Sequence, residues 1–202
     1  MNSKEKTKQH FNQTASCYNT SDDGIFVKDM YDVIVDEIEK TPSGKILDVG
    51  CGNGNLFTLL PDEKYELYGI DFSENMIIEA KSNCKSKASF SVADAEDLPF
   101  EDDTFDIIIC NASFHHYTHP NIVLEEMHRV LKDGGKVLIG DPYIPNGIRG
   151  LMNEVLRFSD NGDYHIYGLE EMENLFVNNG FTPISSLRTG KRTAFYIAEK
   201  FA

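Results

Sequence analysis

Short apolar runs alternate with longer amphipathic segments along this chain. The runs have the length and apolarity of buried strands, and the longer segments carry apolar residues at helical spacing. The first five runs lie at residues 45–49, 65–70, 88–92, 105–110 and 136–141. The helical segments lie near residues 3–18, 25–40, 55–60, 74–84, 121–131, 147–158 and 169–179. This alternation predicts a parallel sheet with helices on both faces.

Two further strand-like runs close the chain, at residues 181–187 and 193–199. Only a short turn centred on Gly190 separates them. Strands joined by so short a connection must pair antiparallel, because a parallel pair needs a crossover of a dozen or more residues. The pattern therefore predicts an α/β fold whose last strand is antiparallel.

Alternating glycines follow the first run. Gly50, Gly52 and Gly54 lie between the apolar residues of 46–49 and a helix-like pattern that begins at Leu56. Glycine lets the backbone turn sharply and approach a ligand closely, and a helix N-terminus offers unpaired N–H groups. This arrangement is typical of a nucleotide-type site. The alternative is a tight strand-to-helix turn that binds nothing.

The spacing of these glycines argues against two common nucleotide sites. A dinucleotide turn, G-x-G-x-x-G, would place its third glycine at Asn55, but the glycine is Gly54. No Lys-Ser or Lys-Thr follows, as a phosphate-cradling loop would require. Asp48, just before the turn, would repel a pyrophosphate and attract an ammonium group.

A second carboxylate, Asp71, stands at the end of the second run. A carboxylate in this place suits the two hydroxyls of a ribose. The alternative is helix capping, by Asp71 or by Ser73, at the start of the segment near 74–84. The two roles are compatible.

Five segments together resemble the class I S-adenosylmethionine-dependent methyltransferases of the small-domain type, in family order and spacing. They read ILDVGCGNG, GIDFSENMI, FSVADAEDLPF, FDIIICNASFHHYTHP and HRVLKDGGKVLIGD, and they lie within residues 44–141, about half of the chain. The resemblance implies a Rossmann-like, seven-stranded, mostly parallel sheet of order 3-2-1-4-5-7-6.

The resemblance also implies a cofactor, S-adenosylmethionine, and its product, S-adenosylhomocysteine. The glycine turn would approach the methionine part and ribose, Asp71 would bind both ribose hydroxyls, and Asp94 would accept from the adenine amino group. The other implied contacts are an Ala95 N–H to the adenine ring, Phe72 and Met76 on its faces, and Asn111 at the amino-acid end. The full cofactor set is Asp48, Gly50, Cys51, Gly52, Asn55, Asp71, Phe72, Met76, Asp94, Ala95, Asn111 and Ala112.

A histidine pair follows the fourth run, where this architecture exposes an active site. We expect His116 to be the catalytic residue, in the acceptor pocket, with Phe11, Tyr18, His115 and Tyr143 as further acceptor contacts. The alternative is a pair of loop or capping histidines. A metal would need further ligands at defined spacing, and the sequence shows no such signature, so no metal is expected.

The expected organisation is one domain, residues 1–202, in four parts. An N-terminal helical lid (1–43) precedes the cofactor-binding core (44–141), an insertion that covers the acceptor (142–168) and a closing helix with a hairpin (169–202). The insertion carries an apolar set: Leu151, Met152, Val155, Leu156 and Phe158. Either these residues form a mobile cover that expels water, or they pack on the sheet.

Charge and composition restrict the class of acceptor and the cellular location that we expect. The net charge is −14, from 33 acidic and 19 basic residues, which makes a nucleic-acid partner unlikely. There is no run of 18 apolar residues and no apolar signal-peptide core, so no membrane span is expected. The four cysteines lack a C-x-x-C pair, which favours reduced thiols and a cytoplasmic location.

The function expected from these observations is transfer of a methyl group to a small molecule by in-line displacement. A protein or nucleic-acid acceptor is one alternative. A non-catalytic module that binds S-adenosylmethionine is the other. The sequence carries no signal for the oligomeric state or the identity of the acceptor.

Overall fold

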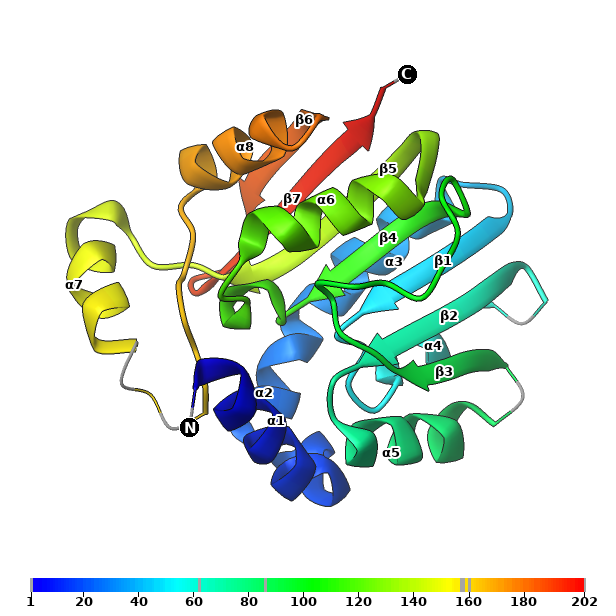
Figure 1. Cartoon of the computed structure of the whole chain (residues 1–202), viewed down its shortest axis with the longest axis horizontal. Coiled ribbons are helices and arrows are strands. Elements are labelled where there is room, and N and C mark those ends of the chain that lie inside the picture. The colour runs from blue at the N-terminus through cyan, green and yellow to red at the C-terminus, as the bar shows by residue number, and fades with distance from the viewer. Residues whose placement is uncertain (1, 62, 86, 157–158, 160, 202) are drawn as a thin grey trace.

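Seven strands form one sheet of order β3-β2-β1-β4-β5-β7-β6 in the computed structural model, which describes residues 2–61, 63–85, 87–156, 159 and 161–201 (Figure 1). The strands are β1 Gly44–Val49, β2 Tyr65–Asp71, β3 Ala88–Val92, β4 Phe105–Asn111, β5 Leu131–Pro142, β6 Phe181–Arg188 and β7 Thr193–Lys200. The first five pair in parallel, and β7 runs antiparallel to both β5 and β6. The predicted sheet, its strand order and its antiparallel last strand are confirmed.

Helices cover both faces of the sheet, which explains why the central strands are apolar on both sides. On one face, Leu47 and Ile108 pack with residues of α6 Pro120–Val130 and α8 Leu169–Asn178. On the other face, Ile46 and Ile107 pack with residues of α3 Tyr31–Glu39, α4 Asn55–Thr58 and α5 Glu74–Cys84. Burial on both faces is the rule for parallel strands, and it leaves only the strand ends for chemistry.

The N-terminal region is more broken than the apolar pattern predicts. The two helices expected near 3–18 and 25–40 are instead a series of shorter pieces. They are α1 Ser3–Thr14, the 3₁₀ turn η1 Ala15–Thr20, α2 Asp22–Phe26, the 3₁₀ turn η2 Val27–Met30, and α3. The pieces pack closely at Gly24 of α2, where a Cβ would lie 1.7 Å from the Tyr18 carbonyl oxygen. Ser21 then caps α2 by accepting the Gly24 N–H.

Strand β5 begins earlier than expected, at Leu131 instead of Lys136, and α6 correspondingly ends at Val130. Leu131 pairs with Phe105 and Lys136 with Ile107, so the residues between them form a bulge. Gly134, with a φ of 74°, makes the turn in this bulge. A glycine in the left-handed region is a common bulge device, and it extends the strand past the break in the apolar run.

Helix α7 Asn146–Leu156 stands at the side of the sheet in Figure 1. Its apolar residues do not pack on the sheet: Leu151 is 74% exposed and Val155 60%. The alternative of ordinary packing is therefore wrong for these side chains, and Phe158 lies outside the described residues. Within the part of the chain that the structure describes, no helix has the length and apolarity to span a membrane.

Candidate functional site

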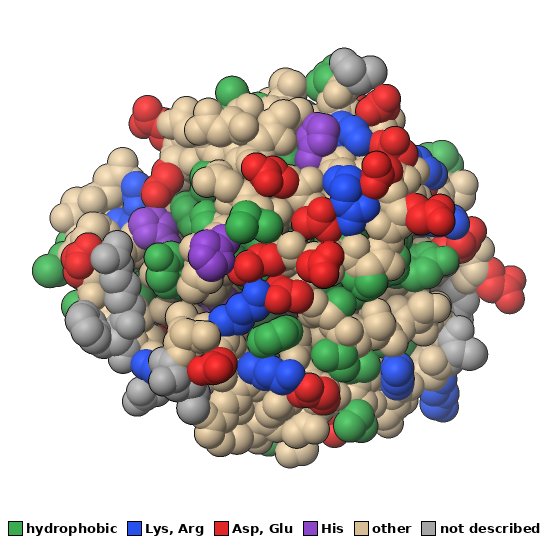
Figure 2. Space-filling view, in the orientation of Figure 1, with side chains coloured by type: hydrophobic (Ala, Val, Ile, Leu, Met, Phe, Trp, Pro, Cys, Tyr) green, Lys and Arg blue, Asp and Glu red, His purple; other side chains and the backbone are tan. Residues whose placement is uncertain are grey.

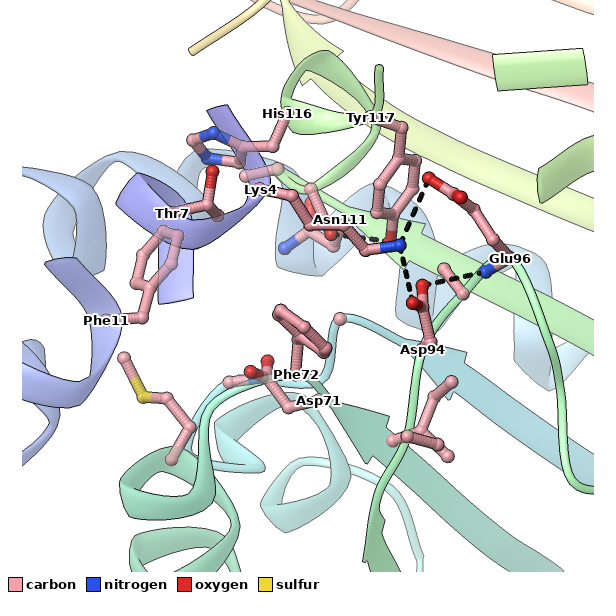
Figure 3. Close-up of a pocket in the computed structure, with 18 of the residues that line it drawn as sticks. Lys4, Thr7, Phe11, Asp71, Phe72, Asp94, Glu96, Asn111, His116 and Tyr117 are labelled. Carbon is pink, nitrogen blue, oxygen red and sulfur yellow. Dashed lines mark hydrogen bonds and ion pairs between the residues drawn. The ribbon is translucent and has the colours of Figure 1, made fainter. Parts of the chain in front are cut away.

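One pocket lies at the carboxyl ends of β1, β2 and β4 (Figure 3). This is the edge of an open α/β sheet where ligands bind. Most of the residues implied as cofactor contacts line it. They are Gly50, Gly52, Asp71, Phe72, Met76, Asp94, Ala95, Asn111 and Ala112.

The glycine turn forms the floor of this pocket, and each glycine has a different reason to be there. All three have positive φ: 80° at Gly50, 53° at Gly52 and 75° at Gly54. A Cβ at Gly50 would lie 2.1 Å from Ser113 Oγ, and one at Gly54 would press on Phe90 at 3.0 Å. At Gly52 the nearest atom would be a Tyr18 ring carbon at 3.8 Å, so this glycine faces open space. The structure thus leaves room for a ligand directly over Gly52.

Asp71 connects the glycine turn to the pocket wall. Its carboxylate accepts the Gly52 N–H at 2.9 Å and the Ser73 N–H at 2.8 Å. Ser73, not Asp71, caps α5, because its Oγ accepts the Met76 N–H at 3.1 Å. Burial raises the pKa of Asp71 to about 6, although these hydrogen bonds favour the charged form.

Asp48 is the buried carboxyl behind the turn. It is 3% exposed, and its Oδ1 has no hydrogen-bond partner among the described residues. It lines a smaller hollow that shares Tyr18, Gly50, Gly52 and Asn111 with the main pocket. Burial, and then the charge of Asp71, raises the pKa of Asp48 to about 8. An unpaired buried acceptor in this position fits a cationic group such as an ammonium.

Asp94 lies at the opposite end of the pocket, and a lysine from the N-terminal helix covers it (Figure 3). Lys4 Nζ is 2.5 Å from Asp94 Oδ2 and 3.2 Å from Glu96 Oε1. The other oxygen, Asp94 Oδ1, accepts the Glu96 N–H at 3.1 Å. Lys4 also lies 5.6 Å from the centre of the Phe72 ring. The carboxylate that the family resemblance implies for adenine thus has a protein cation beside it.

An aromatic group under α1 forms the remaining wall. The Phe11 ring meets the His116 ring edge-on at 5.3 Å and the Tyr18 ring at 6.2 Å. His116, Thr7 and Tyr117 complete this side of the pocket. The predicted lid residue Phe11 therefore lies between His116 and the second one, Tyr18, and Figure 3 shows Phe11 and His116 on the same side of the pocket.

Helix α1 is tied to the segment that follows α7. Ser3 Oγ and Thr7 Oγ1 donate to the Gly162 carbonyl oxygen at 3.1 and 3.3 Å, and Lys6 Nζ donates to the Ser159 carbonyl at 3.1 Å. The fit is close, because a Cβ at Gly162 would lie 2.1 Å from Thr7 Oγ1. Figure 1 shows the two segments side by side near the N-terminus.

The two histidines are buried, and their pKa values shift in opposite directions. His115 Nδ1 lies 2.8 Å from Asp141 Oδ1, and its Nε2 lies 3.5 Å from Asp163 Oδ1. Burial lowers the pKa of His115, but these two carboxylates outweigh it and raise the pKa above its usual range. Burial, and then the charge of His115, lowers the pKa of His116. The neutral His116 imidazole therefore keeps a free lone pair.

Some predicted residues lie elsewhere. Tyr143 is not at this pocket but at a second hollow between α7 and α8, where the Arg188 guanidinium lies 4.6 Å from its ring centre. Tyr143 lies there because it comes directly after the end of β5, at Pro142. The Asn55 side chain bonds Asn19 of η1, and Cys51 lines only the smaller hollow. No described residue of α7 lines the main pocket.

Other contributors were missed from the sequence. Lys4, Thr7, Ser113 and Tyr117 line the pocket, and Asp163 meets the histidines. Ser113 and Tyr117 flank the segment that holds the histidine pair, so their position after the fourth strand could have indicated them. Lys4, Thr7 and Asp163 carry no local signal, because the fold alone brings their segments to the pocket.

Comparison with known proteins places these motifs in context. A family model described as a methyltransferase domain matches residues 47–139. The uncharacterized methyltransferase YcgJ of Bacillus subtilis (strain 168) is 31% identical over 141 residues, which are 67% of this chain and 56% of that protein. Its crystal structure matches with a TM-score of 0.74 and 21% identity, over 85% of this chain and 98% of that one.

Two further relatives have named acceptors. Phosphoethanolamine N-methyltransferase 3 of Arabidopsis thaliana is 36% identical over 53% of this chain and 23% of that protein. The 27-O-demethylrifamycin SV methyltransferase of Amycolatopsis mediterranei (strain S699) is 28% identical over 70% of this chain and 55% of that protein. The chain thus spans about half, or less, of the length of these curated relatives.

Proposed function

Because this chain belongs to the class I S-adenosylmethionine-dependent methyltransferase family, we propose that it binds S-adenosylmethionine and transfers its methyl group to a small molecule. The observation that carries the proposal is the order of three carboxyl groups along the main pocket and the smaller hollow beside it. Asp48 lines the hollow and Asp71 and Asp94 line the pocket, which matches the order in which the cofactor offers an ammonium, a ribose and an adenine amino group.

In this proposal each carboxylate has one partner on the cofactor. Asp48 Oδ1, which is unpaired, accepts from the ammonium. Asp71 accepts from the ribose hydroxyls, and Asp94 from the adenine amino group once Lys4 makes room. Phe72 and Met76 contact the adenine, and the open space over Gly52 admits the ribose and methionine chain. Asn111 and Ala112, at the end of β4, complete the amino-acid end.

A small acceptor suits the covered side of the pocket. Thr7 and Phe11 of α1 close over His116, which restricts the space available beyond the cofactor. The named relatives methylate phosphoethanolamine and 27-O-demethylrifamycin SV, which are small molecules. On the face shown in Figure 2, acidic and basic side chains are interspersed and no basic patch gathers, which favours a small molecule over a nucleic acid.

The chemistry required of the protein is alignment. The sulfonium already activates the methyl group, so the acceptor atom must lie in line with the leaving sulfur and water must be kept out. Holding two reactants in such a geometry can supply about 7–11 kcal/mol of a barrier. We propose that His116, Phe11 and Tyr18 perform this positioning on the acceptor side.

Calorimetry and a labelled-methyl assay test the proposal together. We expect S-adenosylhomocysteine and S-adenosylmethionine to bind with one site per chain and NAD not to bind. A fractionated metabolite extract incubated with the protein and methyl-labelled S-adenosylmethionine should yield a labelled small molecule. Binding of NAD without any response to S-adenosylhomocysteine would refute the cofactor, and label recovered only in protein or nucleic acid would refute the acceptor class.

A further inference from the structure

Two histidines and two aspartates from three segments meet at the acceptor side of the pocket. His115 and His116 form the 3₁₀ turn η3 Phe114–His116, Asp141 is near the end of β5, and Asp163 follows α7. His115 and His116 are each 8% exposed, and Asp141 is 1% exposed. Ionisable groups buried together in this way need pairing or a bound cation.

The distances in this cluster are close to those of a metal site. Asp163 Oδ1 lies 3.5 Å from His115 Nε2 and 3.4 Å from His116 Nδ1. Tetrahedral zinc with bonds of about 2.0–2.1 Å separates its ligand atoms by about 3.3–3.4 Å. Two of the three edges thus nearly match, and all three ligand atoms lie within 4.8 Å of one another. The third edge, between the two ring nitrogens, is at most 4.8 Å, so one imidazole has to rotate for all three atoms to reach one cation.

The hydrogen bonds around the cluster leave the correct nitrogens available. Asp141 Oδ1 accepts the Nδ1–H of His115 at 2.8 Å, so once a cation displaces the second ring proton the Nε2 lone pair faces Asp163. A carboxylate that orients a histidine in this way is the usual outer partner of a metal ligand. His116 Nδ1 forms no hydrogen bond among the described residues, although it is buried. A buried, unpartnered ring nitrogen beside a carboxylate is an independent indication of a missing partner.

We propose that His115 Nε2, His116 Nδ1 and Asp163 Oδ1 bind one divalent transition-metal cation of the zinc type. Imidazole and carboxylate ligands suit this class, and three protein ligands leave a position open for another group. His116 lines the pocket, so the open position faces the acceptor. Resting on the proposed function, the site selects acceptors that offer an oxygen atom to the cation.

Metal binding is measured on the full chain, without any turnover. Protein stripped with a chelator is titrated with Zn²⁺ by calorimetry and with Co²⁺ by visible absorption. We expect one equivalent of each, with the intense absorption of four-coordinate Co²⁺.

Asp141→Asn should weaken Zn²⁺ binding about 10- to 100-fold, as loss of an outer partner does. Asp163→Asn and His116→Ala should weaken it further. His119→Ala, an exposed histidine of the same segment, should bind like the unaltered chain.

The unaltered chain decides the question even if a variant fails to fold. No Zn²⁺ binding, or a Co²⁺ spectrum of six-coordinate type, would overturn the metal site. Equal binding by folded Asp163→Asn protein would do the same. Calorimetry with S-adenosylhomocysteine runs in parallel, so that a lost metal site with intact cofactor binding refutes this inference and leaves the proposed function standing.

Discussion

Lys4 Nζ lies 2.5 Å from Asp94 Oδ2, so the first helix of the chain places a cation on the carboxylate proposed to bind adenine. An adenine amino group must share this carboxylate or displace the lysine. Because both side chains are one-third exposed, the pair contributes only about 0.2–1 kcal/mol. Lys4→Met should therefore tighten S-adenosylhomocysteine binding by at most about fivefold, measured by calorimetry.

The control for this change is Lys132→Met. Lys132 pairs with Asp106 at 2.9 Å with similar exposure, beside the first residues of β1 and β4. It should leave the affinity unchanged. Weaker binding by Lys4→Met alone would mean that the lysine closes over the cofactor instead of competing with it.

Gly52 and Gly134 form a matched pair for testing the ligand cradle. Both have positive φ, 53° and 74°, and a Cβ at either meets no atom closer than 3.8 Å. Alanine at either site should lower the free energy of unfolding by about 1–2 kcal/mol, the cost of the left-handed conformation. Only Gly52→Ala puts a methyl group in the pocket, so only it should also lose cofactor affinity, by tenfold or more. Equal affinities for the two folded variants would contradict the proposal that the cofactor lies over Gly52.

The affinity for S-adenosylhomocysteine should rise with pH between about 6 and 8. Burial raises the pKa of Asp48 to about 8 and that of Asp71 to about 6. The ammonium and the ribose hydroxyls bind the ionised carboxylates, and ionisation increases with pH, so binding releases protons below pH 8. One linked proton limits the slope to about tenfold per pH unit. Calorimetry in buffers of different ionisation enthalpy counts these protons, and Asp48→Asn should abolish most of the slope.

Asp71→Ala should weaken S-adenosylhomocysteine binding by at least tenfold. The change leaves the Gly52 and Ser73 N–H groups and the ribose hydroxyls without their acceptor, at about 1–3 kcal/mol for each buried unsatisfied group. Ser73→Ala separates binding from folding, because it removes the α5 cap and a hydrogen bond to Asn12 of α1 but no group that lines the pocket. That variant should melt at a lower temperature and bind normally. Undiminished affinity in folded Asp71→Ala protein would reduce Asp71 to a structural role.

The exposed face of α7 tests the expected acceptor cover. Leu151 and Val155 are largely exposed, so Leu151→Asn with Val155→Asn should change the melting temperature and cofactor affinity little. We expect acceptor turnover to fall, since a cover that closes on the substrate needs this apolar face. Full turnover in the double variant would show that α7 serves another purpose.

The features that the sequence predicts are those that a local pattern determines. The apolar residues of 46–49 mark a buried strand, and Asp71 marks the end of the next one. Together they predict the sheet and the edge of it at which a ligand would bind. The contact of Lys4 with Asp94 and that of Asp163 with His116 join residues far apart in the chain. No spacing along the sequence predicts either contact. The close approach of Gly24 to the Tyr18 carbonyl likewise depends on how η1 and α2 pack, which the apolar pattern does not show.

The hydrogen bonds from Thr7 and Ser3 to Gly162 join the first helix to the residue just before Asp163. If α1 has to lift to admit the proposed cofactor, we expect it to draw Asp163 away from the histidines. On this view the proposed acceptor side forms only after the cofactor has bound and α1 has closed. We expect initial-velocity patterns of an ordered sequential reaction, in which S-adenosylmethionine enters first and S-adenosylhomocysteine leaves last.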